Sequence, residues 1–392
     1  MKTKKMIVVL LLLGIVPAGI LCTDKSSFAS KTEIIGNEKA KTITIDKKLT
    51  EVTHLLVGKK ISKTSELYNF SSKWFYKNYR KRLLKNWNIF QRKNFIKMGK
   101  WWKKYKPEKQ YDTIFYPFSG PDILNALTFF PASNKYILFG LEPVGEIPDP
   151  YKMSHRNIQF GLQKLQQSIH HIMRMNFFRT LSMKASLRTR SFYSITGILM
   201  YFLGLYDYEI ISIKKFVVNN KSIIAKWKKS DDKTRWNRPS LQKRIPGLEI
   251  VFRKKEGKVQ TLQYFSVNVN NKSLQSTASN FLPFLSKHGE MAAIMKAASY
   301  LLHHYSFTKI RTFILDSTSF IIQDSSGVPI KYFNKNIWDV SYHGYYYKPI
   351  PLFRNRHQPQ LRINTRRFST GKLPFSYGYL IRTSHLITAK KK

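Results

Sequence analysis

The stretch from Tyr111 to Pro150 places the tightest constraint on how this chain folds. It begins with an apolar run, Thr113 to Phe118, which breaks at a Ser-Gly-Pro-Asp turn over residues 119–122. A short apolar helix candidate follows, and a second apolar run, Lys135 to Leu141, ends on the acid Glu142. Strand, glycine turn, helix, strand and terminal acid is the order of parts in a nucleotide-binding half-fold. The stretch therefore predicts a sheet with a crevice beyond its carboxyl end.

Four residues around that crevice are candidates for a ligand site: Ser119, Gly120, Asp122 and Glu142. In dinucleotide-binding folds, backbone N–H groups at the glycine turn hold a polar ligand, and an acid about 20 residues later binds the ribose hydroxyls. Gly120 and Glu142 fit that spacing. The turn departs from G-x-G-x-x-G, because Pro121 has no N–H, and Asp122 can instead cap the following helix. The pattern assigns no catalytic residue.

The turn also resembles a degenerate first motif of the S-adenosylmethionine-dependent methyltransferases, which implies a Rossmann-like unit. Four strings are similar to an uncharacterised family of exported bacterial proteins, some of them lipoproteins. They are FYPFSGPD (115–122), ILFGLEP (137–143), MKAASYLLH (295–303) and IIQDSSGVPIKYF (321–333). The similarity spans residues 111 to 381. It implies export and a domain extent, and it carries over no activity, substrate or site residue.

Helix and strand signals alternate through the rest of the chain, and Lys226 to Arg244 is polar and charged, as in an exposed insertion. The pattern predicts a Rossmann-like mixed α/β sheet over residues 111–392, with helices on both faces and antiparallel strands towards the C-terminus. Helices are expected within Ser154 to Leu205, including a buried one at Ile195 to Leu205, and at Met291 to Tyr305. Strands are expected at Tyr208 to Val218, Gly247 to Phe252, Val259 to Val269, Thr312 to Leu315, Ser319 to Gln323, Val328 to Phe333, near Tyr345, and at Phe375 to Ile381.

Residues 30–110 form a basic region that precedes this domain. Lys31 to Thr64 is a polar lead-in, whereas Ser71 to Lys109 is dense in Lys, Arg and aromatic residues. Apolar residues recur there at helical spacing, which predicts amphipathic helices. These recurring residues form an aromatic stripe, which can pack on the domain, lie in a membrane interface or contact nucleic acid. Packing on the domain is favoured, because such stripes are usually core faces. The members of the stripe are Phe75, Tyr79, Leu83, Trp87 and Phe90.

Residues 1–29 have the pattern of a secretory signal. Lysines precede the apolar run Met6 to Cys22, and small residues lead to Ala29, after which we expect cleavage. An uncleaved anchor and lipidation at Cys22 are the alternatives, although Leu21 occupies a position where lipidation needs a small residue. Cys22 is the only cysteine, so a cleaved chain has no disulfide. The expected location is the periplasm, the cell envelope or the extracellular space.

The formal net charge of +46 favours anionic partners. Because export argues against chromosomal nucleic acid, an anionic membrane surface or envelope polymer is expected, and a genome of low GC content explains the lysines equally well. The sequence thus predicts an exported envelope or surface protein whose α/β domain binds a small ligand or a partner. The alternative is a degenerate methyltransferase-like enzyme or a nucleoside-binding protein.

Metal and nucleophile motifs give no further site. The adjacent pairs at 170–171 and 303–304 place each histidine on a different helix face, and H-E-x-x-H is absent. Ser119 lacks the flanking glycines of a nucleophile elbow. The sequence predicts no resident cofactor and no metal, and His343 is the one histidine that merits a test.

Overall fold

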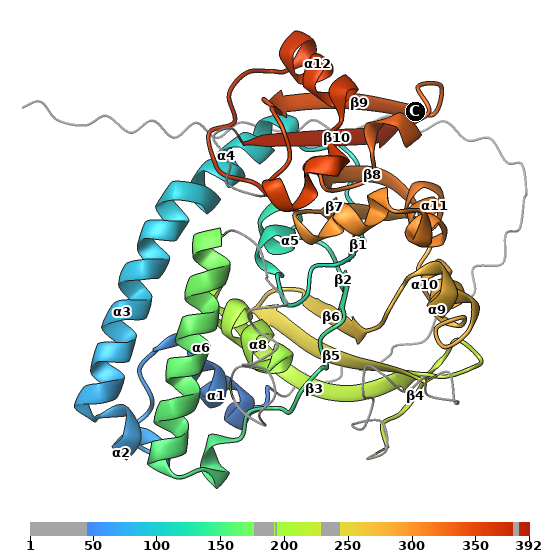
Figure 1. Cartoon of the computed structure of the whole chain (residues 1–392). Helices are drawn as coiled ribbons and strands as arrows, with labels where there is room; N and C mark the ends of the chain where they lie inside the picture. The colour runs from blue at the N-terminus through green and yellow to red at the C-terminus, as the bar shows by residue number, and fades with distance from the viewer. Residues whose placement is uncertain (1–44, 176–191, 193, 229–243, 379–383) are drawn as a thin grey trace, which may run out of the picture. The chain divides into compact units, whose positions relative to one another are not determined.

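The computed structural model describes residues 45–175, 192, 194–228, 244–378 and 384–392 (Figure 1). The expected signal sequence, Cys22 and most of the insertion at 226–244 lie outside the described residues. Residues Ile43–Lys392 form one compact unit, which includes both the basic helices and the sheet. No described helix combines the length and the apolarity needed to cross a membrane.

A ten-stranded mixed sheet organises the described part of this unit, in the order β4-β3-β5-β6-β2-β1-β7-β8-β10-β9. The strands are β1 (Thr113–Tyr116), β2 (Lys135–Gly140), β3 (Tyr208–Val218), β4 (Ile224–Lys226), β5 (Ile245–Lys254), β6 (Val259–Ser266), β7 (Met291–Met295), β8 (Thr318–Gln323), β9 (Trp338–Gly344) and β10 (His385–Lys391).

The five central strands, β6-β2-β1-β7-β8, all run parallel. Numbered among themselves in chain order, they read 3-2-1-4-5, which is the order of a doubly wound dinucleotide-binding sheet. β1 pairs with β2 in the register Thr113 to Lys135, and the short helix α5 (Leu124–Phe129) connects them. The strand order reverses between β1 and β7, and ligands bind at such switch points in open α/β sheets.

Antiparallel strands extend both ends of the parallel core. β3, β4 and β5 form a long insertion that enters the sheet beside β6. At the other end, β10 runs antiparallel between β8 and β9, so β9 is parallel to the central strands. The predicted β5–β6 hairpin and the antiparallel C-terminal strands are confirmed.

Helices cover both faces of the sheet, as the sequence predicts, because successive strand residues point to opposite sides. Ile114 and Tyr116 face the core under the N-terminal helices, whereas Phe115 faces the core under α9 to α11. The helices are α1 (Lys47–Val57), α2 (Tyr68–Ser71), α3 (Trp74–Phe90), α4 (Ile96–Tyr105), α5, α6 (His155–Met175), α8 (Ile195–Leu205), α9 (Asn271–Gln275), α10 (Phe281–Ser286), α11 (Thr308–Ser317) and α12 (Pro359–Phe368). The described residues also contain one π-helical and several 3-10 turns: η1 (Gln91–Phe95), η2 (Pro150–Lys152), η4 (Ala298–His303), η5 (Tyr305–Phe307), η6 (Ile330–Tyr332) and η7 (Pro351–Arg356).

The aromatic stripe of the basic region packs against the core, so the first of its three interpretations is confirmed. α3, η1 and α4 follow one another as a helical run (Figure 1). The Lys and Arg side chains of this run are exposed, except that of Arg80, which is half-buried. The hydroxyl of Tyr79 donates to the carbonyl of Leu56 in α1, at 2.5 Å. The buried residues of α3 are Tyr76, Tyr79, Leu83, Trp87 and Phe90, and Phe75 is half-buried.

Several local predictions are wrong. Met291 to Tyr305 is not a helix: its first five residues form β7, a central strand buried on both faces, and η4 and η5 follow. A continuous apolar run of this kind fits a buried strand as well as a helix. Thr312 to Leu315 lies inside α11, and Val328 to Phe333 contains only the 3-10 turn η6. Part of the polar lead-in forms α1.

The C-terminal part of the chain also departs from its prediction. The described part of Phe375 to Ile381 is not a strand, and the strand β10 follows it at His385–Lys391. The adjacent residues Leu386 and Ile387 are buried on opposite faces of that strand. The lysines at 390–392 make the segment look polar, which is why the sequence does not predict a strand there. The strand near Tyr345 is β9, which ends one residue earlier at Gly344.

Candidate functional site

The turn after β1 has the sharp geometry that the sequence indicates. Phe118 and Gly120 both have positive φ angles, of 58° and 54°, so the chain reverses direction within a few residues. The N–H of Gly120 donates to the carbonyl of Phe139 in β2 at 3.4 Å, which holds the turn against the neighbouring strand. Glycine is suited to this position because it adopts the left-handed region without a side-chain penalty. Residues 119–122 are thereby placed at the carboxyl end of the sheet.

A small cleft opens beside this turn, with a volume of about 70 Å³. Segments at the carboxyl ends of β1, β2, β6 and β7 form it, which is where the sequence places a crevice. Its walls are largely apolar, with Glu142 and Asn268 as the polar side chains. The lining residues are Phe118, Gly120, Phe139, Gly140, Leu141, Glu142, Val267, Asn268, Val269, Ala298, Leu301 and Phe307.

The Glu142 carboxylate folds back over Gly140 towards the turn. A Cβ atom at position 140 would overlap the Oε2 atom of Glu142, lie 2.9 Å from the Tyr264 hydroxyl and lie 3.3 Å from the Cα of Gly120. The absence of a side chain at Gly140 therefore allows strand, turn and carboxylate to meet. Gly120 and Glu142, paired from their spacing, do come together in space. Gly140 is not among the residues that the sequence predicts for the site, although a glycine inside a predicted strand indicates that another group approaches the backbone closely.

Tyr264 on β6 contacts Glu142 through its hydroxyl group. Its hydroxyl donates to the backbone carbonyl of Glu142 at 2.9 Å and lies 3.4 Å from the carboxylate Oε2. Burial, together with the nearby Glu142 charge, raises the pKa of Tyr264 well above its ordinary value. The phenol therefore stays protonated and keeps its hydrogen to donate. Nothing in the sequence pattern points to this residue.

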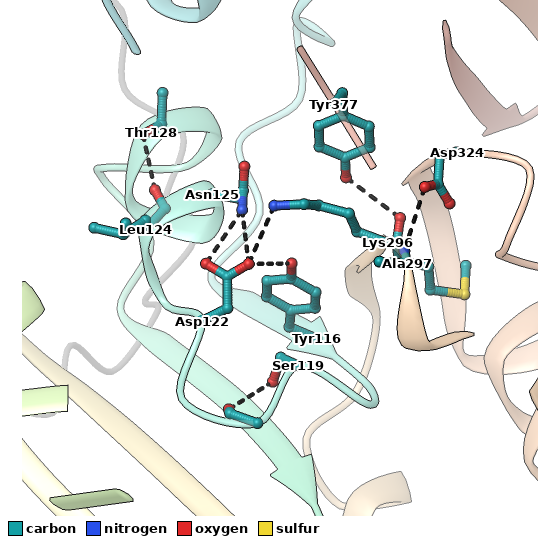
Figure 2. Close-up of polar contacts among 12 residues, drawn as sticks. Tyr116, Ser119, Asp122, Leu124, Asn125, Thr128, Lys296, Ala297, Asp324 and Tyr377 are labelled. Atoms are coloured by element: carbon teal, nitrogen blue, oxygen red, sulfur yellow. Dashed lines mark hydrogen bonds and ion pairs between the residues drawn. The ribbon is translucent and has the colours of Figure 1, made fainter. Parts of the chain in front are cut away.

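Asp122 takes no part in the cleft lining. Its carboxylate lies in a buried polar cluster, where the Tyr116 hydroxyl donates to it at 3.1 Å and Asn125 Nδ2 donates at 3.0 Å (Figure 2). Lys296 Nζ lies 3.2 Å from its Oδ2 atom. Asp122 also does not cap α5, because the cap position of that helix is occupied by Ile123, one residue later. The two carboxylates that were predicted to share a site therefore serve different ones.

Ser119 is buried and turns back on the loop. Its hydroxyl donates to the carbonyl of Gly120 at 3.0 Å, and it does not line the cleft. Of the four predicted ligand residues, the structure thus places Gly120 and Glu142 at the cleft and Ser119 and Asp122 behind it.

A strained corner follows β7 beside the buried cluster. Ala297 has φ 57° and ψ −80°, an unfavourable conformation for a residue with a Cβ atom. Its N–H donates to Oδ2 of Asp324 at 3.3 Å, and the Tyr377 hydroxyl donates to the carbonyl of Met295 at 3.3 Å (Figure 2). Burial raises the pKa of Asp324 above its ordinary value. The next residue, Ala298, lines the cleft, so this corner shapes one of its walls.

His343 has a structural environment. Its ring packs edge-on against the stacked pair Trp101 and Tyr105 of α4, at centroid distances of 4.9 and 4.7 Å. Its Nδ1 atom lies 2.7 Å from the Thr370 hydroxyl, and burial lowers its pKa to about 4. In the ranges that the structure describes, no group of three His, Cys, Asp or Glu side chains is placed to hold a metal ion.

The chemistry of the cleft favours binding of a neutral, hydroxyl-bearing group. The Glu142 carboxylate can accept hydrogen bonds, the Asn268 amide can donate and accept, and the surrounding walls exclude water from one side of a ligand. Comparison of the chain with protein-family models, with curated proteins and with solved structures gives no match in any of the three.

Proposed function

We propose that the α/β domain binds a ligand with a vicinal diol, a nucleoside being the first candidate, in the cleft beyond β1 and β2. The observation that carries this proposal is the meeting of Glu142, Gly140 and the Gly120 turn at the carboxyl end of a 3-2-1-4-5 parallel sheet. In folds of this order, the acid at the end of the second strand accepts the ribose hydroxyls. The fold supports this proposal by analogy, and Glu142 supports it by its chemistry.

The size of the cleft defines what part of the ligand it encloses. Pockets that enclose a whole drug-sized ligand measure about 300–1,000 Å³, whereas this cleft measures about 70 Å³. A sugar ring is therefore the group to be enclosed, with its hydroxyls on Glu142. The base would lie at the mouth, where Asn268 is exposed beside Val267 and Val269.

The proposal is binding and not catalysis. The described lining residues include no Lys, His, Cys or Ser that could act as a base or nucleophile, and Glu142 is already assigned to the diol. A methyl-transfer enzyme remains the alternative, since its cofactor also carries a ribose. The two differ in whether S-adenosylmethionine binds more tightly than adenosine, because only a transferase gains from contacts to the methionine part.

Thermal unfolding in the presence of nucleosides tests the proposal. We expect adenosine or another ribonucleoside to raise the Tm of the wild-type protein, and the shift should grow with the logarithm of the ligand concentration above the Kd. Glu142→Ala should abolish that shift. Glu146→Ala is the matched control, because Glu146 lies nearby in sequence but pairs with Lys215 at the surface and does not line the cleft. A shift that survives in Glu142→Ala, or no shift with any nucleoside, would refute the proposal.

A second candidate function is docking on an anionic layer outside the cytoplasm. The outward face of α3, η1 and α4 favours it: no Asp or Glu occurs from Leu67 to Pro107, and the basic side chains there are exposed. The pattern of residues 1–29 supports export. The exposed cations are Lys73, Lys77, Lys81, Arg82, Lys85, Arg92, Lys93, Lys97, Lys100, Lys103, Lys104 and Lys106.

Vesicle sedimentation tests the docking candidate. Binding should require anionic lipid and should weaken as salt is raised, because the contact is between exposed charges. The mature protein should begin at Ser30 when it is recovered from the exporting cell. Binding to neutral vesicles that salt does not change would argue against docking through this face.

A further inference from the structure

The chain after β9 lies at the same edge of the sheet as the cleft. β9 is parallel to the central strands, so its last residue, Gly344, is at the carboxyl edge together with the ends of β1, β2, β7 and β8. The Gln358 side chain fastens the end of the following segment there, because its Nε2 atom donates to the carbonyl of Ser325, just beyond β8, at 2.9 Å. Residues 345–358 therefore border the edge that contains the cleft.

Aromatic contacts connect this segment with the cleft itself. Phe353 in η7 stacks on Tyr300 in η4, with ring centroids 4.4 Å apart and planes inclined by 25°. Leu301, the next residue, lines the cleft and is 37% exposed. Tyr305, which follows in η5, is 78% exposed. The segment after β9 thus packs directly on η4, which contributes Ala298 and Leu301 to the lining of the cleft.

This surface is cationic and carries exposed rings. No Asp or Glu occurs from Val340 to the C-terminus. The Tyr347 ring is half-exposed and has the Arg362 guanidinium 4.9 Å from its centroid and Lys348 Nζ at 5.7 Å. Arg366 lies one helical turn beyond Arg362 and is exposed. We call these exposed residues the carboxyl-edge surface: Tyr345, Tyr347, Lys348, Leu352, Arg354 and Arg366.

We propose that the carboxyl-edge surface binds a single-stranded nucleic acid and leads one nucleoside of the strand into the cleft. Lys348, Arg354 and Arg366 attract phosphates, and Tyr345 and Tyr347 offer faces on which bases stack. A lipid surface fits less well, because the rings of Tyr345 and Tyr347 carry hydroxyls and are flanked by cations, and the exposed apolar side chains Leu352, Ile363 and Phe368 are separated by basic residues. The part that concerns the cleft rests on the proposed nucleoside binding, whereas the surface itself does not.

Fluorescence anisotropy of a labelled single-stranded RNA of about 20 nucleotides tests the surface. The triple variant Lys348→Gln, Arg354→Gln, Arg366→Gln should weaken binding about tenfold or more at moderate salt. The matched control is Lys60→Gln, Lys63→Gln, Lys255→Gln, which removes the same charge from exposed positions outside both proposed surfaces. The control should change the affinity for RNA by less than about twofold, because it alters only the long-range electrostatic attraction.

A second variant separates base stacking from charge. Tyr345→Leu with Tyr347→Leu keeps the net charge and an apolar side chain, yet removes the stacking faces, and should weaken RNA binding about tenfold. Equal loss in both charge variants would overturn the proposal, since it would show diffuse attraction only. Binding to anionic phosphatidylserine vesicles through the same residues, without RNA binding, would also overturn it. Adenosine binding and RNA binding can fail separately. If adenosine does not bind, but RNA binding is weakened by the substitutions in the carboxyl-edge surface and not by the control, the cleft proposal is refuted and the surface proposal is supported.

Discussion

The Nζ atom of Lys296 lies 3.2 Å from the Oδ2 atom of Asp122, and both side chains are almost completely buried. Lys296 directly follows β7 and Asp122 belongs to the turn after β1, so the ion pair connects the two loops on either side of the point where the strand order reverses. Tyr116 and Asn125 donate further hydrogen bonds to the same carboxylate. The pair lies behind the cleft and connects the loops that follow β1 and β7.

Removing one member of this pair should destabilise the protein strongly. Lys296→Met would leave the Asp122 charge buried without its counter-ion, at a cost of about 3–5 kcal/mol in the free energy of unfolding. Lys296→Met combined with Asp122→Leu should recover a large part of that loss, because the uncompensated Asp122 charge is removed as well. Urea denaturation of the two variants and the wild type measures the difference.

An exposed ion pair provides the control for that experiment. Lys59 lies 2.6 Å from Asp207 at the surface, where Asp207 is mostly exposed to solvent. Lys59→Met should therefore cost less than about 1 kcal/mol. If Lys59→Met and Lys296→Met lower the free energy of unfolding by similar amounts, burial does not make the Asp122–Lys296 pair more important for stability than an exposed pair.

Gly140 should be essential to the geometry of the cleft. Gly140→Ala places a methyl group in the space of the Glu142 carboxylate and close to the Tyr264 hydroxyl. We expect nucleoside affinity to fall about tenfold or more, since hydrogen bonds to a displaced charged group are lost. Calorimetric titration with adenosine measures it. In the matched substitution Gly99→Ala, on α4, the new methyl meets no atom within 4 Å; it should leave affinity unchanged and add up to about 1 kcal/mol of stability.

The sequence predicts those elements whose local pattern matches their final environment. β1, β2, β3 and the β5–β6 hairpin have the apolar runs and glycine breaks of buried strands, and α8 is an apolar segment too short to span a bilayer. β7 fails this test, because a strand buried on both faces has no alternation to distinguish it from a buried helix.

The residues of the candidate site are likewise predictable only where they lie close together in the sequence. Gly120 and Glu142 follow from spacing within one half-fold, and the structure brings them together. The partner of Asp122 does not follow, because Lys296 is 174 positions away and becomes a neighbour only once β7 lies beside β1. A lysine inside an apolar run was the available signal, yet it does not reveal which acid it meets.

Acid should destabilise the fold through buried histidines. The pKa of His343 is about 4 in the folded state, against an ordinary value of 6.5. Between these values the unfolded chain binds more protons than the folded one, so stability is complete above pH 6.5 and is lost as pH falls towards 4. The loss from this one residue amounts to about 3 kcal/mol. Urea denaturation at a series of pH values measures it.

A variant assigns that loss to its source. In His343→Gln the decline of unfolding free energy between neutral and acidic pH should be smaller than in the wild type, although the variant is less stable at pH 7 because contacts with Trp101 and Tyr105 are lost. An unchanged decline would show that His343 does not titrate in the way its burial implies.

Discrimination by the ribose hydroxyls tests the central claim most directly. Calorimetric titration of the wild-type protein should show that adenosine binds about 10- to 100-fold more tightly than 2′,3′-dideoxyadenosine, because only adenosine offers a diol to the Glu142 carboxylate. In Glu142→Ala the two affinities should become equal. Equal affinities in the wild type, or a preference for adenosine that persists without Glu142, would contradict the account.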